Sequence, residues 1–264
     1  MDNIITNLID QYIFDYRSFR RLNKWETLEF KNEDGNIEIS KQIKRYKLGV
    51  GLFNDFDIDT DYEFVSFIFN QELQLRKSEI KNQNTDVLYL YAFFLSKFKR
   101  IEDVWKFVDA KSIDFDSSIG FDTYYFMTFG VDEIYDYVNK TDNNKKELLI
   151  KFIGTKKEDI LFDQEEFENW EKGKYDYYDF VKPIKRPLSF YRIFDHKELY
   201  KVEFLNWVKA VDLTNFRMAY DCICMAEYAE NKEVLIRAIK YYLKHDNAVL
   251  RNQFEKKLEK LMET

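Results

Sequence analysis

The sequence predicts an all-α protein of stacked antiparallel helix hairpins, solenoid-like in arrangement, with a small β-hairpin near the N-terminus. The 264 residues include only 7 Gly and 2 Pro, the residue types that break helices and build tight turns. Segments with apolar residues at three-and-four spacing follow one another over short connections, which is typical of helix pairs. Aromatic residues make up 18% of the chain, so large flat side chains must fill the core.

The N-terminal segment predicts one helix and then the hairpin. Residues 2–24 have the apolar spacing of an amphipathic helix. Residues 27–39 alternate apolar and polar on both sides of Asp34-Gly35, a pair typical of two-residue hairpin turns. We therefore expect a β-hairpin at 27–39.

Helices are expected through the rest of the chain. The last one is the clearest, with Leu250, Phe254, Leu258 and Leu261 on one stripe. The predicted starts lie near Ser40, Thr60, Thr85, Ile101, Asp132, Asn143, Thr155, Asp195, Thr214, Asn231 and Asp246.

Both prolines lie between residues 180 and 191, and proline inside a helix costs about 3 kcal/mol. This break predicts an N-terminal helical lobe over 1–180 and a C-terminal lobe over 181–264 packed against it. Residues 105–122 also echo residues 207–221, each beginning with tryptophan and ending in an aromatic-aspartate pair. Both a diverged duplication and chance similarity in an aromatic-rich chain explain this echo.

Charge and hydropathy narrow the classes of partner. The net charge is −7, whereas a nucleic-acid-binding surface needs concentrated positive charge. No segment reaches the roughly 20 apolar residues that span a bilayer, and the start lacks a secretion signal. We expect no nucleic acid partner, no membrane association and a cytoplasmic location. Cys222 and Cys224 are expected to be free buried thiols, because two-residue spacing turns them apart on a helix.

Two acidic stretches, 54–61 and 114–122, invite comparison with calcium loops. An EF-hand loop needs glycine at position six and glutamate at position twelve. Neither stretch has them: counted from Asp114, these positions hold Ile119 and Tyr125, and counted from Asp55, position twelve is Ser66. Helix capping is the preferred interpretation, although weak calcium binding stays open wherever several carboxylates converge.

The expected caps follow the capping-box pattern, in which a hydroxyl or carboxylate and an acid three residues later bond free backbone N–H groups. The pairs are Thr60 with Glu63, Thr155 with Glu158, and Asp195 with Glu198. Asp116, Ser117 or Ser118 is expected to cap the helix after Phe115.

The sequence predicts no enzyme and no cofactor. Its two histidines, His196 and His245, are assigned structural roles at helix ends. The starting motifs of zinc hydrolases, serine hydrolases and nucleotide-binding proteins do not occur. Glu165, Glu166 and Glu168 are interpreted as a solvated helix face, with a carboxylate-dependent hydrolase as the alternative.

One segment resembles a known class of proteins. Residues 89–123, YLYAFFLSKFKRIEDVWKFVDAKSIDFDSSIGFDT, carry an E-D-x-W helix followed by A-K, F-D and G-F-D. This pattern resembles helical immunity proteins of bacterial polymorphic toxin systems. The resemblance implies a cytoplasmic protein that binds and neutralises a cognate toxin, and it carries over no catalytic residue.

We therefore expect a binding protein whose partner is another protein, which the resemblance implies to be a toxin domain. Tyrosine gives contact area at little entropic cost, and acids select a basic partner. The alternatives are a helical-repeat scaffold or regulatory protein and a carboxylate-dependent metal enzyme. The candidate contact residues are Asp55, Asp57, Asp59, Asp61, Asp114, Asp116, Tyr175, Tyr177 and Tyr178.

Overall fold

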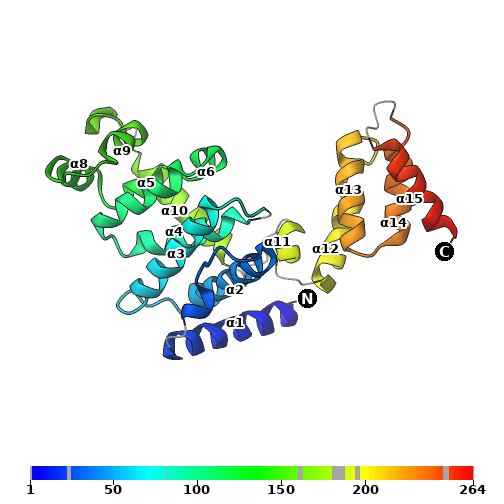
Figure 1. Cartoon of the computed structure of the whole chain (residues 1–264), viewed down its shortest axis with the longest axis horizontal. Coiled ribbons are helices and arrows are strands. Elements are labelled where there is room, and N and C mark those ends of the chain that lie inside the picture. The colour runs from blue at the N-terminus through cyan, green and yellow to red at the C-terminus, as the bar shows by residue number, and fades with distance from the viewer. Residues whose placement is uncertain are drawn as a thin grey trace. The chain divides into compact units, whose positions relative to one another are not determined.

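Helices form every regular element in the part of the chain that the computed structural model describes, so the all-α class is confirmed (Figure 1). The described residues are 2–22, 25–81, 83–159, 163–179, 188–193, 197–245 and 250–263. The chain forms two compact units, Met1–Ile184 and Lys185–Thr264. None of the helices in the described ranges has both the length and the apolar character needed to cross a membrane.

The first part of unit 1 is built from two helix pairs. α1 packs against α2 and α3 against α4, and α4 also contacts α2. The elements are α1 (Asp2–Leu22), the 3-10 turn η1 (Trp25–Leu28), α2 (Gly35–Asn54), α3 (Tyr62–Lys77) and α4 (Thr85–Lys97).

The second part of unit 1 consists of shorter helices and ends in α10. Lys97 pairs with Glu171 near the end of α4, while Phe93 contacts the rings of Tyr175 and Tyr178. α10 therefore runs antiparallel to α4. The elements are η2 (Ile101–Asp103), α5 (Val104–Ser112), α6 (Phe115–Gly120), α7 (Tyr124–Met127), α8 (Val131–Lys140), α9 (Lys146–Ile153), η3 (Lys157–Asp159) and α10 (Gln164–Tyr178).

A buried polar network joins α2 to its neighbours. The Arg45 guanidinium, fully buried, donates to the Glu72 carboxylate and to the Leu28 carbonyl at 2.9 Å. Gln42 Nε2 donates to Glu72 Oε2 at 2.6 Å, and its amide oxygen accepts from the Asn84 backbone N–H at 2.8 Å. The bonds to Leu28 and from Gln42 offset part of the cost of burying this ion pair, although Arg45 Nη2 is buried without a hydrogen-bond partner.

Unit 2 is built around the helix pair α13 and α14, which lie side by side (Figure 1). Asn215 and Asn231 begin these two helices, each accepting backbone N–H bonds with its side chain. Their facing surfaces bury Ile223, Ile239 and Tyr242. The elements are α11 (Leu188–Ile193), α12 (Lys197–Ala210), α13 (Phe216–Tyr228), α14 (Lys232–Tyr242) and α15 (Arg251–Glu263).

The predicted β-hairpin at 27–39 is wrong. Residues 25–28 form a 3-10 turn, and α2 begins at Gly35. Asp34 accepts the Asn36 backbone N–H at 2.8 Å, so Asp34-Gly35 is a helix cap and not a hairpin turn. The predicted start at Ser40 is therefore five residues late. The solenoid-like stacking of the helix pairs stays a prediction.

Two predicted capping boxes are wrong in detail. α3 begins at Tyr62, and its cap residue Asp61 makes no side-chain capping bond. Near Thr155 the acceptor is Asp159, whose Oδ2 accepts from the Thr155 and Lys156 backbone N–H groups at 2.9 and 3.1 Å.

The helix after Asp114 is capped by Asp114 itself, because its Oδ1 accepts the Ser117 N–H at 2.7 Å. Asp195 and the proline segment 181–187 lie outside the described residues.

The two echoing segments differ in structure. Trp105 lies near the start of α5, while Trp207 lies near the end of α12. Phe121-Asp122 follows the end of α6, whereas Tyr220-Asp221 lies in the middle of α13. The two segments do not form equivalent units.

Candidate functional site

The acids predicted as partner contacts gather at opposite ends of α3. Asp55–Asp61 form the connection before this helix, while Asp114 and Asp116 contact Arg76 in its last turn. α3 has 16 residues, so the two clusters are about 24 Å apart at 1.5 Å per residue. They are two separate surfaces.

Basic side chains from α1 hold the first cluster. Arg17 donates to Asp55 Oδ2 and Oδ1 at 2.9 and 2.6 Å, and Arg20 donates to Asp57 Oδ2 at 3.0 Å. The hydrogen bond from Arg17 is the largest cause that holds the pKa of Asp55 below its ordinary value. Asp55 and Asp57 therefore serve first to fasten α1 to the connection between α2 and α3.

Asp61 does not lie on the surface, which corrects its assignment as a contact residue. Its side chain is 0% exposed. It accepts from the Tyr16 hydroxyl, from the Asp57 backbone N–H at 2.7 Å, and pairs with Arg20 at 3.3 Å. Burial raises the pKa of Asp61 in spite of these bonds. In this stretch the exposed residues include Asp59 and the apolar Ile58.

The second cluster surrounds an exposed apolar pair on α6. Phe115 is 77% exposed and Ile119 is 70% exposed. Four-residue spacing puts them on one face of this short helix. Asp116, with a side chain that is 81% exposed, lies between them in sequence. Exposed apolar side chains grouped in this way mark interaction surfaces more often than isolated ones do. We call Phe115, Asp116 and Ile119 the α6 face.

Both ends of α6 are fixed by charged side chains. At the start, Arg76 Nε pairs with Asp114 Oδ2 at 2.6 Å while Asp114 caps Ser117. At the end, Lys111 Nζ donates to the carbonyls of Ser118 and Phe121 at 2.9 and 2.6 Å. Burial lowers the pKa of Lys111. The charges at each end suit the helix dipole, negative at the start and positive at the end.

The inner side of the α6 segment is anchored in the core. Phe121 is fully buried and lies 4.7 Å from the Tyr125 ring and 5.8 Å from the Phe107 ring, centroid to centroid. Gly120 allows a close approach, because a Cβ atom there would lie 2.5 Å from the Tyr89 hydroxyl. The α6 face is therefore carried on a rigid base.

The three predicted tyrosine anchors separate into two classes. Tyr178 is 1% exposed and packs on Phe93, so it is a core residue and its assignment as an anchor is corrected. Tyr175 and Tyr177 are 45% and 43% exposed. Tyr175 is held by an edge contact with Phe93 at 5.0 Å and lies under the Lys97 ammonium at 4.2 Å.

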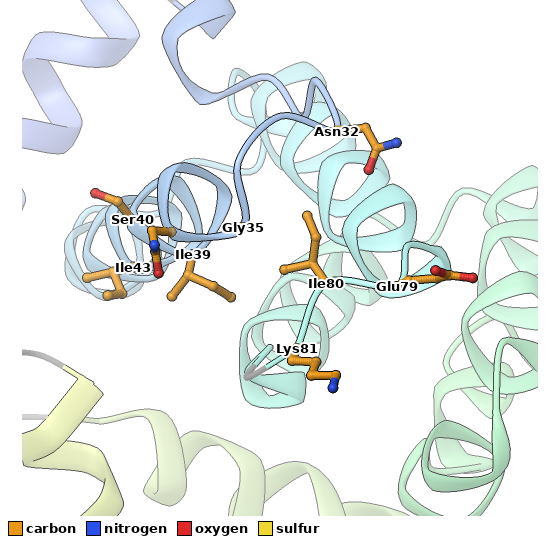
Figure 2. A pocket seen from close by; sticks show the side chains of 9 residues that line it. Asn32, Gly35, Ile39, Ser40, Ile43, Glu79, Ile80 and Lys81 are labelled. Atoms are coloured by element: carbon orange, nitrogen blue, oxygen red, sulfur yellow. The ribbon is translucent and has the colours of Figure 1, made fainter.

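A groove of about 670 Å³ lies between the first half of α2 and the connection that follows α3. Figure 2 shows Ile39, Ile43 and Ile80 around it, with Glu79 and Lys81 at its edge. Its lining combines isoleucines with a few polar groups, a mixture typical of contact surfaces. No pattern in the sequence predicts this groove.

Side chains with metal-binding or catalytic chemistry are dispersed. Within the described ranges, no three His, Cys, Asp or Glu residues are arranged to hold a metal ion. Glu165, Glu166 and Glu168 lie exposed in the first half of α10, and Glu166 accepts from the Tyr124 hydroxyl at 2.8 Å. His245 bonds the Thr214 carbonyl at 3.0 Å, and His196 lies outside the described residues.

The two cysteines differ in exposure. Both are free; Cys222 is buried, but Cys224 is exposed, contrary to the expectation for the pair. Burial raises the pKa of the Cys222 thiol to about 11.

Phe115 and Ile119 were not among the predicted contact residues, although both are exposed in the structure. The signal was present: an aspartate cap, then apolar residues at the first and fifth helical positions, with aspartate and serine between them. Such spacing equally predicts a buried face. Only the structure distinguishes the two, because it places Phe121 and not Phe115 in the core.

In comparisons of the chain with protein-family models, with curated proteins and with solved structures, no match is found.

Proposed function

We propose that this chain is a non-catalytic protein-binding helical protein, specifically an immunity protein that neutralises a cognate bacterial toxin by direct binding. One observation carries the proposal: the α6 face exposes two large apolar side chains beside a carboxylate on a firmly anchored helix. Apolar anchors with a polar rim are the residue types that dominate protein-protein binding.

The acidic character of the chain supports the same proposal. Its net charge of −7 favours encounter with a basic partner. The resemblance of residues 89–123 to immunity proteins includes the whole of α6. An inhibitor that acts by binding needs a preorganised contact surface and no catalytic group of its own.

The test joins recovery of a partner with protection of growth. The tagged chain is purified from the cells that produce it, and proteins bound in stoichiometric amounts are identified by mass spectrometry. Each partner is then expressed in a susceptible host with and without the chain. We expect a partner that stops growth alone and permits growth when the chain is co-expressed.

Bound partners that are harmless when expressed alone would contradict the immunity function and favour the scaffold alternative. Protection that persists when the chain is replaced by an unrelated acidic helical protein would contradict direct and specific neutralisation.

A further inference from the structure

We infer that the α6 face is the docking element of this chain and that it binds a protein surface in which an apolar pocket is bordered by arginine or lysine. This inference rests on the proposed function in so far as the partner is a protein. It adds which residues make the contact and what chemistry they meet.

The apolar part of the inference follows from how the α6 segment divides its side chains. Ser117 and Phe121 are fully buried, while Phe115 and Ile119 are largely exposed. The exposed pair contributes little to the core. Its four-residue spacing gives a compact ridge of the kind that one helix inserts into an apolar groove of another protein.

The rigid mounting of α6 favours tight docking. Asp114 with Arg76 fixes its start, and Lys111 fixes its end. Binding costs entropy when loops and side chains become ordered, and a contact element that is ordered beforehand avoids much of that cost. A six-residue helix on the surface does not hold itself together without such support.

The charge of the partner follows from the different positions of the two aspartates. Asp114 is engaged by Arg76 at 2.6 Å and by the Ser117 N–H. Asp116 reaches Arg76 only at 3.4 Å, and its side chain remains mostly exposed. Its carboxylate can therefore accept hydrogen bonds from a cation of the partner, and arginine offers the best match to a carboxylate.

The same charge argues against other occupants. A second copy of this chain docked symmetrically through α6 would bring Asp116 close to its own counterpart, and like charges in contact oppose binding. An anionic membrane surface or a nucleic acid would meet the same repulsion. A protein surface with an apolar pocket and basic residues at its rim can contact Phe115 and Ile119 through the pocket and Asp116 through the rim.

The experiment uses the full chain and two defined amphipathic peptide probes. Both peptides are amphipathic helices with leucine along one face; arginine residues border that face in one peptide, and glutamate residues border it in the other. Binding is followed by fluorescence anisotropy at low and high salt. We expect the arginine peptide to bind at least about tenfold more tightly than the glutamate peptide, with affinity falling as salt rises.

Matched variants locate the contact. Phe115→Ser and Ile119→Ser are each expected to weaken binding of the arginine peptide by about tenfold or more, and Asp116→Lys by about as much. Phe14→Ser and Asp142→Lys are the controls, because both residues are exposed elsewhere on unit 1. These controls should leave the dissociation constant within about twofold of the original chain.

Equal affinity for the two peptides, no binding of either, or losses in the controls as large as those at α6 would overturn the inference. Its failure is separable from that of the proposed function. Growth protection that survives Phe115→Ser and Ile119→Ser would refute the α6 assignment alone. Peptide binding through α6 without any toxic partner would refute the immunity function alone.

Discussion

Lys111 shows how one residue links the core of unit 1 to its surface. The residue is only 8% exposed, yet it carries an ammonium group. That group donates to two carbonyls at the end of α6, where unpaired carbonyls would otherwise carry a desolvation cost. Its position in the sequence, on α5 and before the α6 segment, gives no sign of this role.

We predict that Lys111→Met lowers the free energy of unfolding by about 2 kcal/mol, since hydrogen bonds to charged groups contribute about 1.5–3 kcal/mol. Methionine keeps most of the length and the apolar character of the lysine stem but donates no hydrogen bond. Urea denaturation followed by circular dichroism measures the change. Lys172→Met, at an exposed position of α10, is the control and should shift the value by less than about 0.5 kcal/mol. An equal change in the free energy of unfolding of both variants would show that Lys111 does not stabilise the end of α6.

The acids of the 55–61 connection were predictable as charged groups but not as internal partners. Arg17 lies 38 residues before Asp55, and Tyr16 lies 45 residues before Asp61. Local sequence shows the run of aspartates but not the helix that folds back over it. For this reason Asp61 was assigned to the surface although the structure buries it.

The lowered pKa of Asp55 leads to a pH-dependent prediction. A carboxyl whose folded pKa is below its unfolded value, here near 3.8, contributes stability above the unfolded pKa and loses it as pH falls through the folded pKa. Arg17→Met should therefore lower the free energy of unfolding slightly at pH 7, because exposed ion pairs contribute little. The cost should disappear below the folded pKa.

Urea denaturation of the Arg17→Met variant and of the original chain over a pH series measures this difference. An Asp55→Asn background provides the control, because the Arg17 substitution should there cost much less at pH 7. A loss that stays constant down to the lowest pH would show that Arg17 acts through packing and not through the ion pair.

At the scale of elements, α2 explains why the N-terminal hairpin prediction failed. The helix buries Glu38, Gln42 and Arg45 on one face. A search for apolar periodicity passes over such a face, because it assumes that buried positions are apolar. The alternation around Asp34-Gly35 was then the strongest local signal. In the structure, Gln42 and Arg45 on this face donate to Glu72 on α3.

The contact between α1 and α2 depends on Gly51. A Cβ atom at this position would overlap the Tyr12 carbonyl of α1 and lie 3.0 Å from the Tyr16 Cβ. We predict that Gly51→Ala lowers the free energy of unfolding by about 1–3 kcal/mol, because overpacking forces the two helices apart. Thermal and urea denaturation measure the loss.

Gly173 supplies the matched control for that substitution. It lies within α10, and a Cβ atom added there would meet nothing within 4 Å. Gly173→Ala should raise the free energy of unfolding by about 0.5–1 kcal/mol through helix propensity. If Gly51→Ala is also stabilising, α1 does not need this close approach.

At the scale of the whole molecule, the composition predicted the all-α class. It did not predict which helices pack against one another. Scarce glycine and proline predicted helices, and the predicted starts at Thr85 and Ile101 agree with α4 and η2. The opposite placement of the two acidic clusters follows from the direction of α3, because residues 55–61 precede its start while Arg76 in its last turn contacts Asp114 and Asp116. Spacing along the chain does not reveal that direction.

The division between Ile184 and Lys185 yields the last prediction. Unit 2 has its own buried core, in which Phe204, Ile239 and Phe254 are nearly inaccessible. A segment with its own core folds by itself if the apolar area it buries outweighs its conformational entropy. We expect residues 185–264 expressed alone to be helical and to unfold cooperatively. Phe254→Ala should lower the stability of this fragment by about 3 kcal/mol, the cost of a large-to-small change in a core.

Circular dichroism of the fragment, with and without Phe254→Ala, tests both parts of this prediction. Met262, on the exposed side of the same helix, provides the control, because Met262→Ala removes little buried surface and should cost less than about 0.5 kcal/mol. A fragment without helical signal would contradict independent folding. A helical fragment that melts over a broad range and responds equally to both substitutions would lack a packed core. Residues 185–264 would then not form a packed core when expressed alone.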